Sequence, residues 1–153
     1  MRVFVILTLV LGARCCPDGW IQHSLSCYHF SHDLETWPGA DYMCEKMGGK
    51  LVEIETAAEN AYLTPIVDSQ KHNYWIGLSD VQEEGIWMWM ESKEKLSTTG
   101  FSHWYPNQPD NSEANENCAT INFDVGGKWN DWHCNGKEAN YICEKDRETD
   151  VVG

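Results

Sequence analysis

The segment at residues 104–134, WYPNQPDNSEANENCATINFDVGGKWNDWHC, is the stretch around which the rest of the chain is organised. Between aromatic and apolar anchors it carries five side chains with oxygen donors: Gln108, Asp110, Glu116, Asn130 and Asp131. A hard cation such as Ca²⁺ takes about 6–8 oxygens and accepts this mixture of carboxylates and amides. A softer metal calls for His or thiolate ligands, and His133 stands alone nearby. Because none of the five is a nucleophile, the pattern predicts a calcium ion held for binding.

Length and charge narrow the class of protein. A chain of 153 residues supports one domain with a single sizeable core. The apolar run Val3–Leu11 follows Met1-Arg2, is too short to span a bilayer, and is typical of a secretory signal peptide. We expect a signal peptide at residues 1–15 with cleavage near 13–15, a domain at 16–146, a tail at 147–153, and an extracellular protein without a membrane span. The net charge of -13 argues against nucleic acid or an anionic membrane as a partner.

Seven cysteines in a secreted chain predict disulfides. Six remain if Cys15 leaves with the signal peptide, and their spacing alone does not choose among the connectivities. No CxxC or HExxH spacing is present, which argues against zinc and thioredoxin-like chemistry. If cleavage leaves Cys15 in place, the odd thiol could bridge two chains into a homodimer.

Local signals predict two helices and several short strands. Asp18-Gly19 indicates the turn of a hairpin. A helix over residues 36–47 has Pro38 in its first turn and Tyr42, Met43 and Met47 on its core face. The capping box at Thr56–Glu59 begins a second helix, with an apolar face formed by Ala61, Tyr62 and Ile66 and with Pro65 expected to kink or shorten it. Strands are expected at residues 51–54, 73–78, 86–90 and 118–123, the last with alternating faces, then around Trp129 and at 141–144.

This order of elements predicts an α+β domain. The polar segment at residues 98–117 is long for a loop in a compact domain, and such loops usually carry function. Three of the five oxygen-bearing side chains, Gln108, Asp110 and Glu116, lie in this segment.

Three motifs then give the chain a family resemblance: YWIGL at residues 74–78, Gln108-Pro109-Asp110 and Trp129-Asn130-Asp131. The sequence resembles a C-type lectin-like domain over Cys16 to Cys143. The resemblance implies the double-looped α+β fold of this family, with two helices and two small antiparallel sheets. It also implies the disulfide pairs Cys16–Cys27, Cys44–Cys143 and Cys118–Cys134.

The resemblance assigns the five oxygen-bearing side chains to one calcium site that also holds a sugar. It implies a cis Pro109 that directs Gln108 and Asp110 toward the ion, with two vicinal sugar hydroxyls completing the shell. In the family, Gln-Pro-Asp accompanies galactose or N-acetylgalactosamine. Galactose binders often add an aromatic ring after this motif, but residues 111–117 contain none. Trp132 or His133, beside the second motif, is the candidate for that place, and mannose cross-binding is the alternative.

A second calcium site is suggested by Asp80 and Glu84, which match acidic ligands of the auxiliary site of the family. Asn111 and Asn117 stand where carboxylates are common, and losing two charges should weaken this site.

The resulting hypothesis is a secreted calcium-dependent lectin without enzymatic activity, binding galactose-type or mannose-type glycans on microbial or cell surfaces in innate immunity. A glycosidase also uses paired carboxylates, but here the carboxylates alternate with amides around a proline, which suits an ion. The remaining alternative is a mineral- or surface-binding matrix protein on the same fold.

Overall fold

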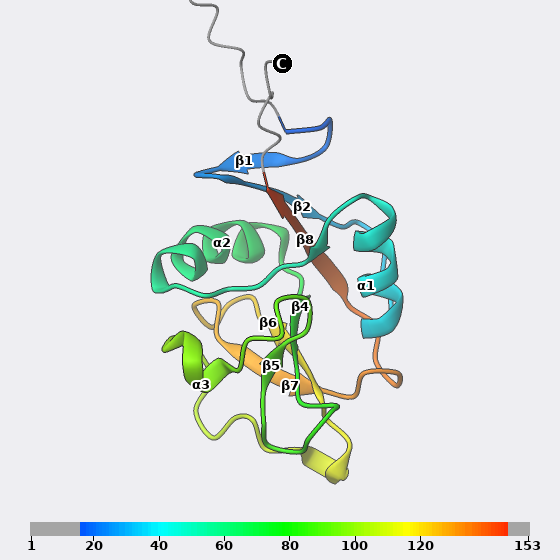
Figure 1. Ribbon diagram of the computed structural model, residues 1–153, viewed down its shortest axis with the longest axis vertical. Coiled ribbons are helices and arrows are strands. Elements are labelled where there is room, and N and C mark those ends of the chain that lie inside the picture. The colour runs from blue at the N-terminus through cyan, green and yellow to red at the C-terminus, as the bar shows by residue number, and fades with distance from the viewer. Residues whose placement is uncertain (1–15, 147–153) are drawn as a thin grey trace, which may run out of the picture.

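The computed structural model describes residues 16–146, and the expected signal peptide, Cys15 and the tail at 147–153 lie outside them. It is an α+β domain (Figure 1). The elements are β1 Ile21–His23, β2 Ser26–Phe30, α1 Trp37–Lys46, β3 Lys50–Leu51, α2 Ala57–Gln70, β4 Tyr74–Ser79, β5 Met88–Trp89, α3 Leu96–Thr99, the 3-10 helix η1 Ser112–Ala114, β6 Cys118–Ile121, β7 Trp129–Trp132 and β8 Asn140–Asp146.

The strands form two antiparallel groups that meet at β8. The order is β1-β2-β8-β4-β6-β7, with β3 on β8 and β5 on β4. The expected separation into two small antiparallel sheets is incomplete, because Tyr74 and Trp75 of β4 pair in parallel with Asn140 and Tyr141 of β8. This parallel pairing connects the two antiparallel groups. In Figure 1 the β1–β2 hairpin lies at one pole, and residues 112–114 lie at the opposite pole.

Helix α1 begins where the sequence predicts. The Thr36 side chain accepts from the Gly39 N–H at 3.3 Å, with Pro38 in the first turn. The predicted core face is wrong at Tyr42, which is 55% exposed. The buried face consists instead of Trp37, Ala40 and Cys44, spaced by three and four residues. Met43 and Met47 are partly buried against the same cluster.

Helix α2 begins at the predicted capping box. Thr56 Oγ1 accepts from the Glu59 N–H at 3.1 Å. The helix continues through Pro65 to Gln70, so the proline does not shorten it. Its predicted apolar face is shifted: Ala61 is exposed, while Leu63, Val67 and the polar Asn60 are buried. The polar Asn60 can be buried because its side-chain amide donates a hydrogen bond to the Gly127 carbonyl and accepts one from Trp129 Nε1–H.

Several strand predictions differ from the structure in position or length. The hairpin turn lies at Ser24-Leu25, and the turn at Asp18-Gly19 precedes β1. The strand expected at residues 51–54 is β3 at Lys50–Leu51, and β5 covers only part of residues 86–90. The short helix α3 has no counterpart among the predictions. Strand β6 is buried along its whole length rather than on one face, because protein covers both sides of it.

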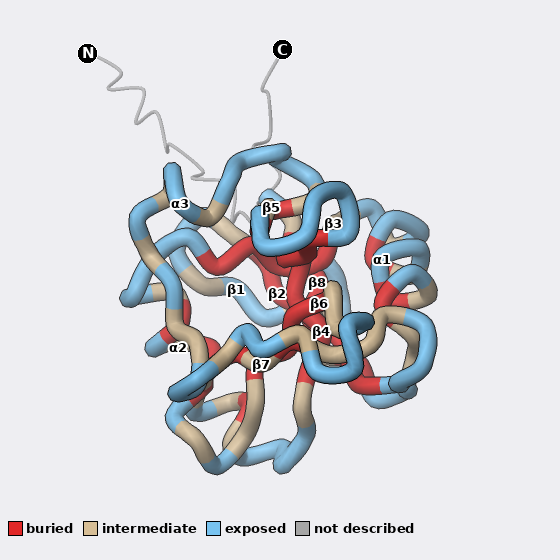
Figure 2. Tube along the Cα trace, turned by 90° about the horizontal axis from the view of Figure 1, so that it is seen from below, coloured by how far each residue is buried: buried red, intermediate tan, exposed pale blue. Residues whose placement is uncertain are grey.

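Buried residues lie mainly at the centre of the domain (Figure 2). They form two hydrophobic clusters. Leu63 and Val67 of α2 pack in one cluster with Ile76 and Trp129, while Trp37 and Cys44 of α1 pack in the other with Trp75 and Tyr141. Burial of this aromatic and aliphatic surface is the main favourable term in folding. The structure contains the three disulfides that the resemblance implies: Cys16–Cys27, Cys44–Cys143 and Cys118–Cys134. No helix within residues 16–146 is long and apolar enough to cross a membrane.

Candidate metal centre

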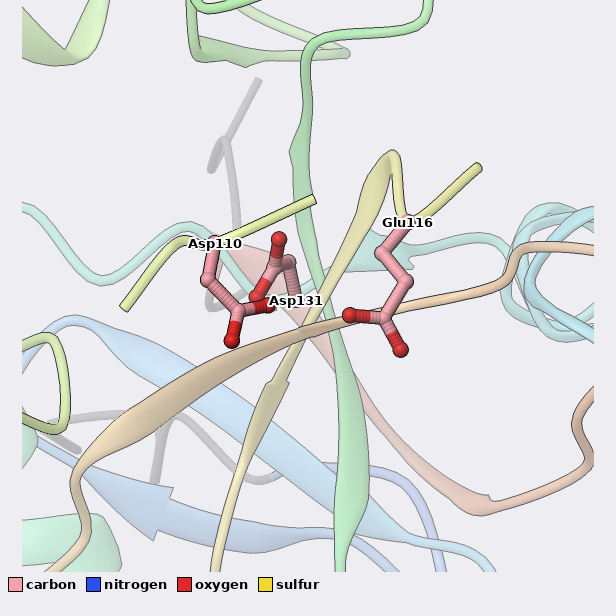
Figure 3. A group of neighbouring side chains, drawn as sticks. All are labelled: Asp110, Glu116 and Asp131. Atoms are coloured by element: carbon pink, nitrogen blue, oxygen red, sulfur yellow. The ribbon is translucent and has the colours of Figure 1, made fainter. Parts of the chain in front are cut away.

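Three of the five predicted ligands converge at one place. Asp110 lies in the long loop, Glu116 lies just before β6, and Asp131 lies on β7 (Figure 3). One carboxylate oxygen from each lies within 4.8 Å of the others. Antiparallel pairing of β6 with β7 explains part of this convergence, because Cys118 stands opposite Trp132 and Ala119 opposite Asp131. Asp131 therefore faces the same small volume as Asp110 and Glu116, which precede it by 21 and 15 positions in the sequence.

The backbone of the long loop is tied to β7 and to the carboxylates. The Tyr105 N–H donates to the Trp129 carbonyl at 2.8 Å, which fixes the start of the loop. The Gln108–Pro109 peptide bond is cis, as the resemblance implies. The Ser112 N–H lies 3.2 Å from Asp110 Oδ1 and 3.2 Å from Glu116 Oε2. One backbone donor thus holds two of the three carboxylates together, a role that no sequence signal indicated.

Asp131 is the buried member of the group, with 0% of its surface exposed. Its Oδ2 accepts the Asn111 N–H at 2.7 Å. Its Oδ1 is buried and has no hydrogen-bond partner within the described part of the chain. A buried carboxylate oxygen without a partner is costly, and a bound cation would satisfy it. The residues present therefore fit a hard cation.

The negative charges of the group also favour a bound cation. The pKa of Glu116 is raised from its ordinary value by burial, and further by the negative charges of Asp131 and Asp110. Three carboxylates so close together repel one another, and a divalent cation would offset this repulsion.

The two predicted amide ligands lie beside the carboxylates. Gln108 Oε1 accepts the Asp110 N–H at 3.1 Å. Asn130 donates through Nδ2 to the Asp131 carbonyl at 3.1 Å. Both amides are thus hydrogen-bonded to residues of the carboxylate group, and their direct coordination of an ion stays a prediction.

The residues predicted for a second ion also come together. Asp80 is 3% exposed, its Oδ2 accepts the Gly85 N–H at 2.8 Å, and its Oδ1 has no partner among residues 16–146. Glu84 Oε1 accepts from Asn111 Nδ2 at 2.7 Å. The Asn117 carbonyl accepts the Asp80 N–H at 3.2 Å, and Asn117 Oδ1 is buried without a partner in the same described region. Burial raises the pKa of Asp80, and the charges of Glu84 and Asp131 add to the shift.

Trp132 packs inward rather than standing free beside the site. Its ring meets that of Trp75 edge-on, with centroids 5.8 Å apart, and it joins the core cluster of α1. This packing favours a structural role, and its contact with sugar remains a prediction. His133 instead lines a cavity of about 300 Å³ next to Glu116, together with Ser112, Glu113, Asn115, Gly136 and Lys137. Sequence reasoning singled out His133 but missed the cavity, because its lining comes from two separate loops.

Comparison with known proteins identifies the family. The family model of the lectin C-type domain matches residues 33–145. The chain belongs to this family. Its fold is that of the C-type lectin carbohydrate-recognition domain, a family of non-enzymatic glycan-binding domains.

Individual relatives agree with this assignment. The chain is 32% identical to a perlucin-like protein of Mytilus galloprovincialis over 151 residues, which is 94% of each chain. It is 36% identical to the C-type lectin domain family 10 member A of Rattus norvegicus, covering 87% of this chain but only 42% of that protein. Among solved structures, the cow C-type carbohydrate-recognition domain of CD23, in the presence of a GlcNAc2Man3 oligosaccharide, superposes with a TM-score of 0.78 at 32% identity, over 88% of this chain and 98% of that one.

Proposed function

We propose that this protein is a secreted lectin that binds sugar through a calcium ion held by Gln108, Asp110, Glu116, Asn130 and Asp131. The observation that supports this proposal best is the buried Oδ1 of Asp131, which has no hydrogen-bond partner among residues 16–146 and lies with Asp110 and Glu116 in one carboxylate group. Buried polar atoms normally have a hydrogen-bond partner, so this unpaired oxygen calls for a ligand such as a cation. Membership of a glycan-binding family supports a sugar as the ligand of that ion.

In this proposal the carboxylates and the amides have different roles. The carboxylates of Asp110, Glu116 and Asp131 supply negative charge and can accept hydrogen bonds from sugar hydroxyls. The amides of Gln108 and Asn130 can donate hydrogen bonds, which carboxylates cannot do. Bound Ca²⁺ supplies a positive centre that two vicinal hydroxyls can coordinate. The positions of donors and acceptors around the ion then select the orientation of the hydroxyl pair.

The arrangement Gln108-Pro109-Asp110 favours galactose-type ligands, with mannose cross-binding because the aromatic platform is missing. The loop at residues 111–117 contains no aromatic residue, and Trp132 packs on Trp75. The expected partners are microbial or cell-surface glycoconjugates, consistent with innate immune recognition. Useful avidity would need several sites on one particle, because a single shallow sugar site binds weakly.

The test is binding to immobilised glycans with calcium and with excess chelator, followed by competition with free galactose and free mannose. Calcium-dependent binding competed better by galactose supports the proposal. The double substitution Gln108→Glu, Asp110→Asn exchanges amide and carboxylate and should shift competition toward mannose. Binding retained in chelator would contradict the calcium site. Stronger competition by mannose, unchanged by the double substitution, would show that the motif does not set specificity.

A control separates this function from mineral or surface binding. The protein is incubated with calcium carbonate in the presence of excess sugar. Retention on the mineral under these conditions, together with no binding to any glycan, would favour the matrix alternative.

A further inference from the structure

The turn that follows β7 brings a histidine ring onto an asparagine–glycine pair. His133 Nδ1 accepts the Gly136 N–H at 2.8 Å and lies 3.3 Å from the Asn135 N. Asn135 and Gly136 are both exposed to solvent. Asn135-Gly136 is the only Asn-Gly pair in the sequence. The ring therefore contacts the backbone nitrogen that directly follows an exposed asparagine side chain.

This contact depends on the glycine. A Cβ placed on Gly136 would lie 2.9 Å from His133 Cγ and 2.9 Å from Nδ1, closer than real Cβ atoms come to other heavy atoms. Glycine also leaves the backbone freer to change its dihedral angles than any other residue does. The first property allows the contact with His133, and the second favours an attack of the Gly136 nitrogen on the neighbouring side chain.

We propose that Asn135 is a site of spontaneous deamidation in which His133 acts as the base. The Gly136 nitrogen attacks Asn135 Cγ while its proton passes to His133 Nδ1. A new N–Cγ bond closes a succinimide ring, the Cγ–Nδ2 bond breaks, and the imidazolium returns the proton to the departing nitrogen, which leaves as ammonia. One water then opens the ring at either carbonyl and gives aspartate or isoaspartate. The net reaction consumes one water and releases one ammonia.

The acceptor of the Gly136 N–H distinguishes this turn from an ordinary one. A backbone carbonyl that accepts an N–H is too weak a base to take its proton, whereas imidazole is the side-chain group that most often acts as a general base. A positioned base commonly raises the rate of a proton transfer by about 10²–10⁴. Solvent exposure of both residues supplies the water for ring opening.

The modification would change the surroundings of the candidate metal centre. His133 Nε2 lies 2.6 Å from the side-chain amide of Asn115, so the ring connects the turn at 134–136 to the loop that carries Glu116. With Nδ1 accepting from Gly136, Nε2 carries the ring hydrogen, and the Asn115 amide presents its oxygen to it. Isoaspartate lengthens the backbone and removes the Gly136 N–H from its present position on Nδ1. Gly136 and Lys137 line the cavity next to Glu116, so this cavity would change shape with age.

The experiment ages the intact, disulfide-bonded protein in neutral buffer at physiological temperature and follows Asn135 by peptide mass and isoaspartate content. A free peptide with the sequence of residues 132–138, its cysteine blocked, gives the reference rate. We expect conversion in the native protein at least about tenfold faster than in the peptide. Equal or slower conversion in the native protein would overturn the proposal.

Two variants test the base itself. His133→Phe should slow conversion of Asn135 at least to the peptide rate, whereas His103→Phe in another loop should leave it unchanged. An unchanged rate in a folded His133→Phe variant would overturn the role of the ring. If that variant does not fold, the comparison of native protein with peptide still decides. Because the readout is peptide mass, its result is independent of whether the protein binds calcium or sugar.

Discussion

The Asn111 N–H donates to Oδ2 of Asp131 at 2.7 Å and joins the long loop to β7. The contact uses one oxygen of a fully buried carboxylate and leaves Oδ1 without a partner among the described residues. Asp131 therefore has two separate roles in the proposed site. One oxygen positions the loop that carries Asp110 and Glu116, and the other remains available to the ion. Loop conformation and ion binding should be thermodynamically coupled through this side chain.

The first prediction concerns this coupling. Calcium should raise the melting temperature of the native protein, because an ion that binds only the folded state stabilises it by about 3–4 kcal/mol at several hundred times its Kd. Asp131→Asn should remove most of this increase. The measurement is thermal unfolding with calcium and with chelator. Asp146→Asn, at the exposed end of β8, is the control and should retain the full increase. An equal calcium effect in the Asp131→Asn protein would contradict the assignment.

Mild acid should release the ion. The pKa of Glu116 is raised by burial and by Asp131 and Asp110, so this carboxyl takes up a proton at a higher pH than an ordinary glutamate. Protonation competes with the metal, so calcium affinity should be full above the raised pKa and should fall as pH drops through it. Calcium titrations across this range check the prediction. Glu116→Gln should bind calcium weakly with a flatter pH dependence, and a native affinity that is constant into mild acid would refute the mechanism.

The sequence predicted those parts of the fold that depend on neighbouring residues. The starts of α1 and α2 follow from Thr36 and Thr56, because a capping side chain contacts a backbone group only three residues away. The face of α1 was assigned wrongly at Tyr42, because apolar residues occur on more than one side of this helix and only tertiary packing distinguishes them. The parallel contact between Trp75 and Tyr141 joins strands far apart in sequence, and no local pattern encodes it.

The candidate site was also predicted only in part. Its carboxylates could be named from the spacing of motifs and from the family resemblance. The contribution of the Ser112 N–H could not be predicted, because it arises from a turn in which Asn111, Glu113 and Ala114 adopt positive φ. Such conformations are uncommon for residues other than glycine and follow from the surrounding contacts rather than from residue type.

Asn60 should be essential for the stability of β7. Its Oδ1 accepts the Trp129 Nε1–H at 2.9 Å, and its Nδ2 donates to the Gly127 carbonyl at 3.3 Å. Asn60→Leu has a similar volume but leaves both groups buried without a partner. We expect a loss of about 2–4 kcal/mol in the free energy of unfolding, measured by urea denaturation in chelator. The neighbouring exposed Ala61→Ser should cost far less, and equal costs would contradict the role of the amide.

Glu59 should make the fold less stable at high pH. Burial raises its pKa from 4.5 to about 7 and the charge of Glu144 adds to the shift, while the Tyr28 hydroxyl, donating to Oε1 at 2.7 Å, offsets part of it. The folded state therefore holds a proton that the unfolded chain releases, and stability falls as pH rises from 4.5 to about 7. Glu59→Gln removes this charge and keeps an acceptor for Tyr28.

The substitution should therefore stabilise the protein above neutral pH by about 1 kcal/mol, after allowance for partial solvent screening, and have little effect near pH 4. Chemical denaturation at the two pH values is the measurement. Glu138→Gln, on an exposed loop, should show no such dependence on pH. A Glu59→Gln protein that loses stability equally at both pH values would show that its hydrogen bonds outweigh its charge.

The last prediction is that the protein binds a second calcium ion more weakly than the first. Asp80 Oδ1 and Asn117 Oδ1 are both buried without a partner within residues 16–146, and Asp80 lies close enough to Asp131 for their charges to interact. Asn117 supplies an amide oxygen where a carboxylate would bind more strongly. Asn111 donates through Nδ2 to Glu84 and accepts the Glu116 N–H through Oδ1, so fewer charges hold the second ion. Calorimetric titration of the metal-free protein should show two binding events. Asn117→Asp adds a carboxylate and should tighten the weaker event, while Asp80→Asn should remove it and leave sugar binding at saturating calcium largely intact. A single binding event in the native protein, unchanged by Asn117→Asp, would restrict the calcium chemistry of this lectin to the Asp110, Glu116 and Asp131 group.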